Sequence, residues 1–387
     1  MFLDKVIKRN RALVDATVNF HKLGLLEPDT YVVDVDTFLK NSKLILDKAN
    51  SLDIKLYFML KQIGRNPYLA KKLVEMGYIG AVVVDFRCGQ LMKDHNIPIG
   101  NVGHLVQPPQ SQLASFIDYG IDVFTVFSME KLIEINKAAK KVNKVQDVII
   151  KVSDEDDLFY SGQMSGIKNR ELKRFITKAK ALNNIKIVGA TAFPCYLYDE
   201  EAKQVVSTPN YESVKKAVEI MQAEGLDVKQ INTPSTTSVS TLELMSEGIG
   251  NYGEPGHGLS GTTPAHAYAD LEEVPAVLYL SEISHNFRGK SYCYGGGHYR
   301  RSHVENCLIV NKDLSEHKSK VYPVDDDSID YYFEIKDPQE VSASVIMAFR
   351  FQMFVTRSKV VLIEGLSNNN PKIIGVYNGL GYLYETR

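Results

Sequence analysis

The chain is organised around the sequence Lys-Leu-Tyr-Phe-Met-Leu-Lys-Gln-Ile-Gly-Arg-Asn-Pro, residues 55–67. Its first part, Leu56–Leu60, is a continuous apolar run bounded by polar residues, which predicts a strand buried on both faces. The run ends on Lys61, and Gly64 and Pro67 then predict a turn and the start of a helix. A buried strand that turns directly into a helix is the opening of a β/α unit.

Lys61 stands at the end of this predicted core strand, where burying an amine costs free energy unless the amine has a partner or a task. One interpretation is a lysine whose stem packs on the core while its ammonium reaches water. The other is a Schiff-base lysine, whose pKa falls on burial so that the neutral amine can attack an aldehyde. Residues elsewhere in the chain decide between the two.

Strand and helix patterns alternate from this stretch onward, in units of roughly 25–30 residues, which is typical of β/α units and a parallel sheet. Eight such units favour a closed (β/α)8 barrel, and no glycine-rich turn of an open doubly wound sheet follows the first strand. We therefore expect an N-terminal barrel over residues 1–265. The expected strands cover residues 55–60, 81–86, 99–106, 123–127, 147–152, 185–193 and 228–233, with an eighth near 253–261.

After Pro264 the sequence changes to short β-type runs separated by turns such as Asn369-Asn370-Pro371 and Asn378-Gly379. These turn residues and the loss of helical spacing predict a β-rich domain over residues 266–387. The predicted fold class is therefore α/β, a (β/α)8 barrel of the TIM type followed by a C-terminal β-rich domain.

The composition limits the classes of partner. The 387 residues carry 45 basic and 47 acidic side chains, a net charge of −2, which gives no reason to expect nucleic acid or a membrane surface. No apolar run reaches the roughly 18 residues of a membrane span, and the first ten residues do not resemble a signal peptide. The four cysteines are too scattered for a disulfide framework, so we expect a cytoplasmic protein.

Hydroxyl side chains cluster in Asn-Thr-Pro-Ser-Thr-Thr-Ser (residues 232–238), directly after the penultimate barrel strand and before a helix. Clustered hydroxyls beside the free N–H groups of a helix start can bind an anion such as phosphate. Ordinary helix capping by Ser235 or Thr236 is the alternative, although capping needs only one hydroxyl.

The segment Gly-Glu-Pro-Gly-His-Gly-Leu-Ser-Gly-Thr-Thr-Pro (residues 253–264) falls where the eighth strand is expected. Its four glycines would let the backbone approach a ligand closely. A glycine-rich linker between domains is the alternative, but a linker does not explain Glu254.

Four motifs in this order resemble the fold-type III pyridoxal-phosphate enzymes, namely alanine racemase, the ornithine and diaminopimelate decarboxylases and the D-threonine aldolase group. They are Asp34–Asn41, the lysine strand with its Gly-x-Asn-Pro exit, the Ser/Thr loop and the Glu-Pro-Gly segment. The resemblance covers about residues 25–365, and a barrel followed by a β-domain is the family's architecture. Tyr-Gly-Gly-Gly-His-Tyr-Arg-Arg (Tyr294–Arg301) is most similar to the YhfX-type branch, regarded as candidate amino acid racemases.

The resemblance implies pyridoxal 5'-phosphate as cofactor, with Lys61 carrying it as the internal aldimine. It implies that Glu254 pairs with the pyridine nitrogen, as a glutamate does in the decarboxylases, where alanine racemase has an arginine. A carboxylate there keeps the ring nitrogen protonated and makes the cofactor a stronger electron sink. The phosphate would be held by Ser235, Thr236 and Thr237 and by the backbone of Gly256 and His257.

Racemisation needs a proton-transfer group on each face of the carbanion. Lys61 would serve one face, and in alanine racemase a tyrosine from the partner subunit serves the other, which implies a homodimer. Tyr294 is our prediction for that tyrosine. The alternatives are Cys293, His298 and Tyr299, and a hairpin turn at 295–297 with merely exposed neighbours is also consistent with the sequence.

Other candidates have weaker support. Alanine racemase has an arginine-containing loop for the substrate carboxylate, but here the stretch is acidic, Ser153–Asp157. Of Arg300 and Arg301, at most one should point toward a site, because neighbours on a strand face opposite ways.

An aromatic residue after the sixth strand, Phe193 or Tyr196, would either support the cofactor ring or simply pack in the core. His104 is interpreted as a core histidine.

Metal binding is not expected, because His298, His303 and Cys307 have spacings that suit one strand face poorly. The sequence thus predicts a pyridoxal-phosphate-dependent amino acid racemase. A decarboxylase, an aldolase-like lyase and a non-catalytic pyridoxal-phosphate-binding protein stay open, as does a sugar-phosphate enzyme on the same barrel.

Overall fold

The computed structural model describes residues 2–322, 324–325 and 327–386. The chain forms two compact units, each assembled from several segments. We call Ile45–Met59 with Ala70–Gly256 the barrel unit, and Met1–Leu44, Leu60–Leu69 and His257–Arg387 the sheet unit. The domain boundary expected at residue 265 stays a prediction.

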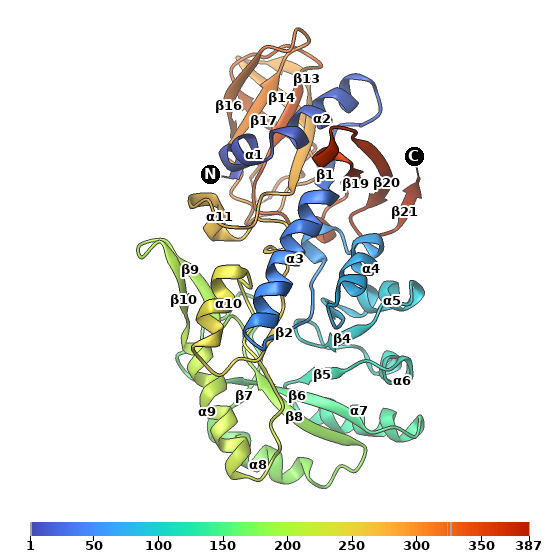
Figure 1. Cartoon of the computed structure of the whole chain (residues 1–387), viewed down its shortest axis with the longest axis vertical. Helices are drawn as coiled ribbons and strands as arrows, with labels where there is room; N and C mark the ends of the chain where they lie inside the picture. The colour runs from blue at the N-terminus through green and yellow to red at the C-terminus, as the bar shows by residue number, and fades with distance from the viewer. Residues whose placement is uncertain (1, 323, 326, 387) are drawn as a thin grey trace. The chain divides into compact units, whose positions relative to one another are not determined.

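The barrel unit is built on a parallel sheet with strand order β2-β12-β11-β8-β6-β5-β4-β3 (Figure 1). An isolated parallel bridge between Phe58 and Ala81 links the two end strands of this order. All eight predicted strands are present, so the predicted barrel-type α/β fold is confirmed. They are β2 (Lys55–Leu56), β3 (Ala81–Val83), β4 (Ile99–Val102), β5 (Val123–Val126), β6 (Gln146–Ser153), β8 (Ile185–Thr191), β11 (Gln230–Asn232) and β12 (Tyr252–Gly253).

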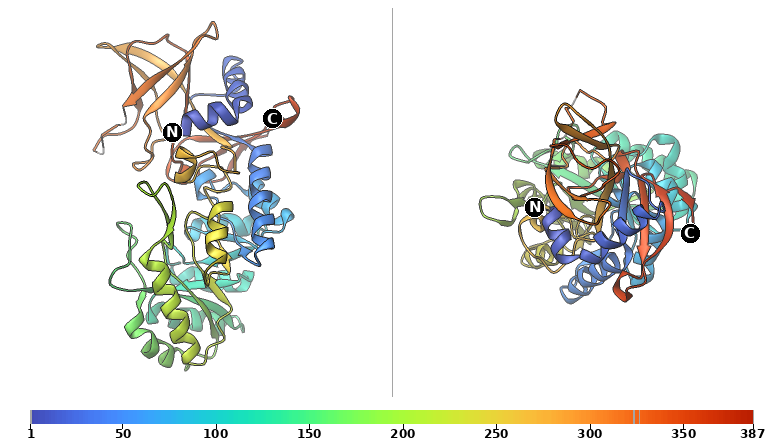
Figure 2. Two further views of the ribbon diagram at one scale, coloured as in Figure 1. Left: turned by 60° about the vertical axis from the view of Figure 1, so that its left-hand side comes forward. Right: turned by 90° about the horizontal axis from the view of Figure 1, so that it is seen from above.

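Several of the helices that follow these strands begin at a side chain that caps them. Asp85 accepts a hydrogen bond of 2.8 Å from the N–H of Cys88, and Ser128 caps the next long helix in the same way. Helix α9 packs against β6 and β8 and contacts helix α8 (Figures 1 and 2). The helices from residue 35 to 246 are α3 (Val35–Ser51), α4 (Pro67–Met76), α5 (Phe86–Asp94), α6 (Gln110–Tyr119), α7 (Met129–Lys141), α8 (Asn169–Ala179), α9 (Pro209–Ala223) and α10 (Val239–Ser246).

The lysine stretch differs from its expected form. Tyr57, Phe58, Met59 and Leu60 are buried as predicted, but regular strand pairing stops at Leu56. Beyond it the N–H groups of Tyr57 and Met59 bond to the carbonyls of Gly253 and Pro255, outside any regular strand. Lys61 then begins a short 3-10 helix, η1 (Lys61–Ile63). Apolar burial was readable from the sequence, whereas the pairing depends on a partner about 200 residues away.

Three short strands were not expected in the barrel unit. Strand β7 (Ile167–Lys168) pairs with the end of β6, and β9 (Tyr196–Asp199) forms a hairpin with β10 (Gln204–Ser207). All three lie in segments for which the sequence predicted no strand, after the carboxyl ends of β6 and β8. The loops at this edge of the sheet are therefore partly ordered by their own strand pairing.

The sheet unit contains a ten-stranded, mostly antiparallel sheet of order β14-β17-β16-β15-β18-β13-β1-β19-β20-β21. Strand β1, from the N-terminal segment, lies in it, parallel to β19 and antiparallel to β13. The predicted β-rich C-terminal domain is confirmed, with this one strand added from the other end of the chain. The strands are β1 (Thr30–Asp34), β13 (Val277–Phe287), β14 (Lys290–Tyr294), β15 (Asn306–Val310), β16 (Glu316–Tyr322), β17 (Tyr332–Lys336), β18 (Ser344–Met347), β19 (Lys359–Glu364), β20 (Lys372–Asn378) and β21 (Leu383–Glu385).

The sheet unit is completed by short helices. Helix α2 packs on β13 and β18, and η1 packs on η2. The core of this sheet includes the edge-to-face pair Tyr31 and Tyr279, with ring centroids 5.0 Å apart. The helices are α1 (Phe2–Arg9), α2 (Arg11–Lys22), α11 (Pro264–Tyr268), η2 (Met353–Val355) and η3 (Leu366–Asn368). Within the described part of the chain, no helix combines the length and apolar character needed to cross a membrane.

Candidate functional site

Glu254 is a buried carboxylate in the barrel unit, directly after β12. Its Oε1 accepts hydrogen bonds from two side-chain amides, Asn232 Nδ2 at 2.9 Å and Asn101 Nδ2 at 3.3 Å. The two asparagines come from β11 and β4. Hydrogen bonds to a carboxylate favour its ionised form and oppose the effect of burial. This buried acid is therefore surrounded by groups suited to a negative charge.

The two amides are themselves held in orientation. Thr125 donates to Oδ1 of Asn101 at 2.8 Å, and Gln230 donates to Oδ1 of Asn232 at 2.9 Å. Each amide oxygen is thus occupied, so each amide nitrogen is directed toward Glu254. Single asparagines on predicted strands carry no functional signal, and the sequence analysis missed both of them.

The second carboxylate oxygen of Glu254 faces a histidine. His104 Nε2 lies 3.8 Å from Oε2 of Glu254, and both side chains are buried. The His104 ring also meets Phe193 edge-to-face, with centroids 5.4 Å apart. His104 is buried, as its interpretation as a core histidine expected, but it lies beside the predicted site carboxylate. Its position two residues after β4 was the available signal, because sites of parallel barrels form at the carboxyl ends of strands.

The Ser/Thr loop has an unusual backbone. Ser235 and Thr236 have φ angles of 110° and 52°, a region that residues with side chains rarely adopt. Such strain is found mainly where a function requires it, and consecutive residues of this kind can turn backbone N–H groups toward an anion. Helix α10 begins just beyond the loop, and Ser238 caps it. The loop therefore combines strained backbone with a helix N-terminus.

The three predicted phosphate ligands have different surroundings. Thr236 donates its hydroxyl hydrogen to the carbonyl of Tyr196 at 2.8 Å. Thr237 is buried, and its Oγ1 accepts from the N–H of Glu254 at 3.4 Å. Ser235 is half-buried. The Ser/Thr loop and Glu254 are thus directly linked within the barrel unit, and their roles stay predictions.

Lys61 belongs to the sheet unit, where its short helix is fixed from several sides. Gly64 closes η1 with a φ of 68°, and a side chain there would meet Val360 at 3.0 Å. Arg65 lies over the ring of Phe354, 5.0 Å from its centroid. Asn66 accepts from the N–H of Leu69 at the start of α4. Lys61 itself is half-buried, and it begins this fixed turn rather than ending a strand.

His257 is the predicted site residue that lies near Lys61 within the sheet unit. Its Nδ1 contacts Thr262 Oγ1 at 3.0 Å, and its Nε2 contacts Gln352 Nε2 at 3.3 Å. Burial lowers the pKa of His257 well below its usual value, with smaller effects from the positive charges of Arg350 and Lys61. A neutral ring that accepts from Gln352 and donates to Thr262 satisfies both contacts.

The glycines of the 253–264 segment have neighbours within the protein itself. A side chain at Gly253 would meet Leu56 at 2.8 Å, and one at Gly261 would meet the carbonyl of Val274 at 2.3 Å. Gly261 also has a φ of 63°. Close packing against the protein thus accounts for these two glycines, while Gly256, the predicted phosphate neighbour, is half-buried.

Tyr294 ends β14 and is 37 % exposed, with its ring 5.9 Å from that of Tyr332. Cys293 points the other way and is fully buried, and burial raises the pKa of its thiol to about 12. Arg300 and Arg301 are both exposed. Among the predicted candidates for a second proton-transfer group, Tyr294 is accessible and Cys293 is not.

The three glycines after Tyr294 fit against the rest of the sheet unit. Side chains at Gly295, Gly296 and Gly297 would come within 2.2 Å of the Asp330 carbonyl, 2.1 Å of Asp29 Oδ2 and 2.4 Å of the Tyr279 ring. The segment that follows β14 therefore packs so closely on the rest of the sheet unit that there is no room for side chains at these three positions. The glycines are explained by this close packing and not only by a hairpin turn.

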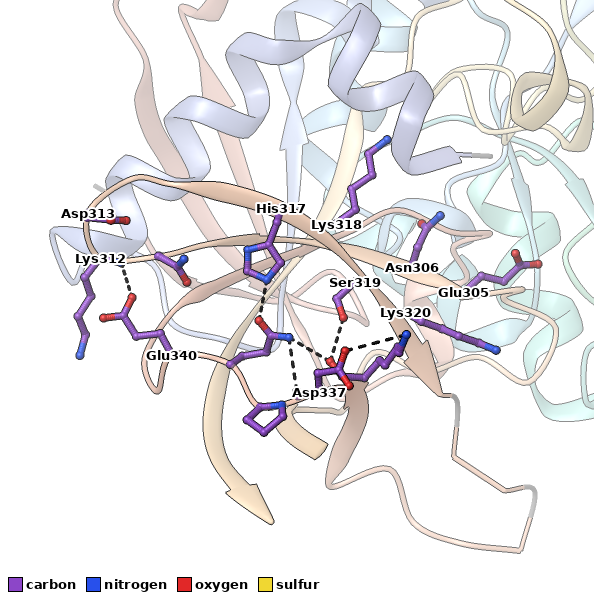
Figure 3. A pocket seen from close by; sticks show the side chains of 14 residues that line it. Glu305, Asn306, Lys312, Asp313, His317, Lys318, Ser319, Lys320, Asp337 and Glu340 are labelled. Atoms are coloured by element: carbon purple, nitrogen blue, oxygen red, sulfur yellow. Dashed lines mark hydrogen bonds and ion pairs between the residues drawn. The ribbon is translucent and has the colours of Figure 1, made fainter. Parts of the chain in front are cut away.

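A hollow of about 1080 Å³ in the sheet unit is unrelated to the predicted site (Figure 3). It is lined by polar side chains that pair with one another, for example His317 Nε2 with Gln339 Oε1 at 2.7 Å. None of the predicted site residues lines it. Among the residues that the structure describes, no three histidine, cysteine, aspartate or glutamate side chains gather in a way that could hold a metal ion.

Two family profiles match the chain. The alanine racemase N-terminal domain matches residues 33–264, and the YhfX-like C-terminal domain matches residues 278–373. The chain therefore belongs to the alanine racemase-fold family of pyridoxal-phosphate enzymes, within which racemases, decarboxylases and aldolases occur.

Within that family the chain belongs with the YhfX-like proteins. It is 41 % identical over 384 residues to the uncharacterized protein YhfX of Escherichia coli (strain K12), covering 98 % of this chain and 99 % of that protein. The solved structure of D-threonine aldolase from Filomicrobium marinum has a TM-score of 0.66 at 13 % identity, covering 92 % of this chain and 96 % of the aldolase. Alanine racemase from Bacillus anthracis has a TM-score of 0.65 at 17 % identity, covering 92 % and 99 %. Both likenesses show the fold.

Proposed function

We propose that this protein is a pyridoxal-phosphate-dependent amino acid racemase that removes and returns the proton at Cα of its substrate. The observation that carries the cofactor part of this proposal is the buried carboxylate of Glu254, held by the amides of Asn101 and Asn232. A buried acid with two oriented donors is costly to build and serves little purpose in packing alone. Because the chain belongs to a family of pyridoxal-phosphate enzymes, we assign this acid the role of pairing with the pyridine nitrogen.

The residues present fit the cofactor group by group. Glu254 is suited to pair with a protonated pyridine nitrogen, because its surroundings favour the ionised carboxylate. The strained backbone at Ser235 and Thr236, before the N-terminus of α10, is suited to the phosphate. Thr237 and the backbone of Gly256 and His257 complete that set in the proposal.

Lys61 is the proposed lysine that holds the cofactor and then moves the proton on one face of Cα. Lys61 lies close enough to His257 for its positive charge to contribute to the lowered pKa of that ring. Because His257 is held neutral, it adds no second positive charge at the start of the reaction. The cofactor, when bound, supplies the electron sink that stabilises the carbanion at Cα.

Tyr294 is the proposed proton-transfer group for the opposite face, contributed across a homodimer. It is accessible at the end of β14, whereas the neighbouring Cys293 is buried and has a raised pKa. The glycines at 295–297 fix the backbone that follows it. A tyrosine on a fixed backbone is suited to return a proton from a defined direction.

A decarboxylase or aldolase-like lyase is the second candidate, and Glu254 is the observation that favours it. A carboxylate at the ring nitrogen strengthens the electron sink, which suits loss of carbon dioxide or of an aldehyde as well as loss of a proton. A non-catalytic pyridoxal-phosphate-binding protein is a further alternative, which the extra sheet unit with Tyr294 argues against.

An absorbance spectrum of the purified protein, taken before and after borohydride, tests the cofactor. We expect a band near about 420 nm that disappears on reduction, with the pyridoxyl label on Lys61. Solvent-deuterium exchange at Cα with retention of the amino acid would then support a racemase. Release of carbon dioxide or of an aldehyde would favour the second candidate, and an unlabelled, colourless protein would contradict both.

A further inference from the structure

The barrel unit contains a buried lysine that the proposed function does not use. Lys151 lies on β6, two residues before the carboxyl end of that strand, and its exposed fraction is 2 %. Within the described part of the chain, it is the only lysine that is buried. Transferring an ammonium group out of water costs several kcal/mol unless the charge is paired or lost. The burial of this lysine therefore requires an explanation, such as a ligand that offsets the cost of removing its ammonium group from water.

The surroundings of Lys151 provide almost no counter-charge. Its Nζ donates to Ser165 Oγ at 2.8 Å and lies 5.7 Å from the centroid of the Phe127 ring. No carboxylate of a described residue lies within ion-pair distance of it. Burial lowers the pKa of Lys151 to about 8, with a small opposing effect from Cys195. Burial also raises the pKa of the Cys195 thiol far above neutral pH, so that thiol stays uncharged.

The acidic residues that follow β6 do not balance this lysine. Asp154 pairs with Lys216 at 2.9 Å, and Glu155 pairs with Lys168 and Arg170, both at 2.8 Å. These ion pairs lie at the protein surface. Asp157, in the same acidic stretch, accepts hydrogen bonds from the Ser213 hydroxyl and the Asp154 N–H. These three acids have partners of their own, and none of them forms an ion pair with Lys151.

Lys151 belongs to the same parallel sheet as β12, the strand that Glu254 follows. The Cys195 thiol, which follows β8, is influenced electrostatically by Asp157, by Glu254 and by Lys151. Lys151 is also close to the carboxyl end of its strand, the edge of a barrel at which ligands bind. A ligand at this edge would meet a positive charge that the protein has left uncompensated.

We propose that Lys151 binds the carboxylate of the amino acid substrate, an inference that rests on the proposed function. An ammonium with one hydroxyl partner retains donors for a carboxylate. Charge-assisted hydrogen bonds of this kind are strong, and they are stronger in a site shielded from water. The bound carboxylate would supply the counter-charge that the folded chain lacks.

The test compares amino acids with their amides, which carry no carboxylate. The cofactor-loaded protein is titrated with each standard amino acid in its L and D forms, binding is followed by the cofactor absorbance, and the tightest binder is compared with its amide. We expect the wild-type protein to prefer the acid by about 10- to 100-fold. Lys151→Met and Lys151→Gln should reduce that preference to within about threefold. Lys186→Met, on the exposed side of β8, is the matched control and should keep it.

The outcomes separate this inference from the proposed function. If the cofactor band forms on Lys61 but both Lys151 variants keep the preference for the acid, the Lys151 inference is wrong and the proposed function stands. If no cofactor band forms or no amino acid binds, the proposed function and the inference fail together. If neither variant unfolds cooperatively on heating, Lys151 is needed for the fold itself and the inference is also overturned.

Discussion

Asn232 Nδ2 donates a hydrogen bond of 2.9 Å to Oε1 of Glu254, which links strand β11 to the residue that follows β12. The same amide accepts a hydrogen bond from Gln230. A buried acid is thus tied to the barrel through a partner that is itself fixed. This hydrogen bond has two consequences: it connects the end of β12 to β11, and it stabilises the negative charge proposed for Glu254.

Replacing Asn232 by alanine tests that link. We expect Asn232→Ala to lower the free energy of unfolding by about 1–3 kcal/mol, because a buried carboxylate loses a donor. The shift is measured by urea unfolding, with Asn50→Ala on the exposed face of α3 as the control. An unfolding free energy equal to that of wild type would show that Glu254 does not depend on this amide.

Much of the fold could be predicted because it follows from local sequence. Most of the barrel strands lie in runs that are visible without knowing their partners, whereas the eighth was expected near residues 253–261 from the count of β/α units. The place of β1 was not predictable in this way, because its neighbours β13 and β19 lie more than 240 residues further along the chain. Pairing over such distances depends on the whole fold.

The site was predictable where residue type itself signals chemistry. Lys61, Glu254 and the hydroxyl cluster were found because an amine, an acid and hydroxyls stand at strand ends; their roles stay predictions. Asn101 and Asn232 were missed, since an asparagine on a strand has no characteristic pattern. The strained φ angles of the Ser/Thr loop were likewise invisible, because they arise from packing rather than from glycine.

Removal of the amine of Lys61 should abolish covalent attachment of the cofactor. We expect Lys61→Ala to show no pyridoxyl label after borohydride and to lose turnover by at least about 10²–10⁴-fold. Peptide mass mapping measures the label, and Lys71→Ala on the exposed face of α4 is the control. A label that persists on another lysine would assign the attachment site elsewhere.

Two substitutions at Ser235 separate the hydroxyl from the backbone. Both Ser235→Ala and Ser235→Gly remove the hydroxyl, but only glycine relieves the strain of a φ of 110°. If the hydroxyl binds phosphate, both variants should weaken binding of pyridoxal phosphate by about tenfold. Binding of pyridoxal, which has no phosphate, should stay unchanged and serves as the matched ligand. Equal affinity of all three proteins for pyridoxal phosphate would show that the Ser235 hydroxyl does not bind the phosphate.

Tyr294→Phe tests the second proton-transfer group. Loss of the phenol should reduce interconversion of the two enantiomers by about 10²–10⁴-fold, while Lys61 still exchanges the Cα proton of one enantiomer with solvent. Proton NMR in deuterium oxide measures exchange for each enantiomer separately. Tyr384→Phe, at another exposed tyrosine, is the control. If exchange falls equally for both enantiomers, Tyr294 does not act on only one face of Cα as proposed.

Asp29 predicts a pH dependence of stability in the sheet unit. Burial raises its pKa to about 6 from 3.8, although Ser358 and Tyr279 donate hydrogen bonds that oppose the shift. The folded state therefore holds this proton more tightly than the unfolded state does, and the stabilisation is fully present below about pH 4. It is lost as the pH rises from about 4 to 6, with a slope of at most about 1.4 kcal/mol per pH unit.

Asp29→Asn should remove this contribution, because an amide does not ionise over that range. Urea unfolding at pH 4.5, 5.5, 6.5 and 8 should show the variant gaining stability relative to wild type up to about pH 6 and then no further. The comparison cancels other titrating groups that both proteins share. The Asp29 carboxylate lies against Gly296, in the segment that follows Tyr294. A stability difference between the two proteins that does not change with pH would mean that Asp29 is charged over the whole range. Its protonation would then not contribute to the stability of that segment.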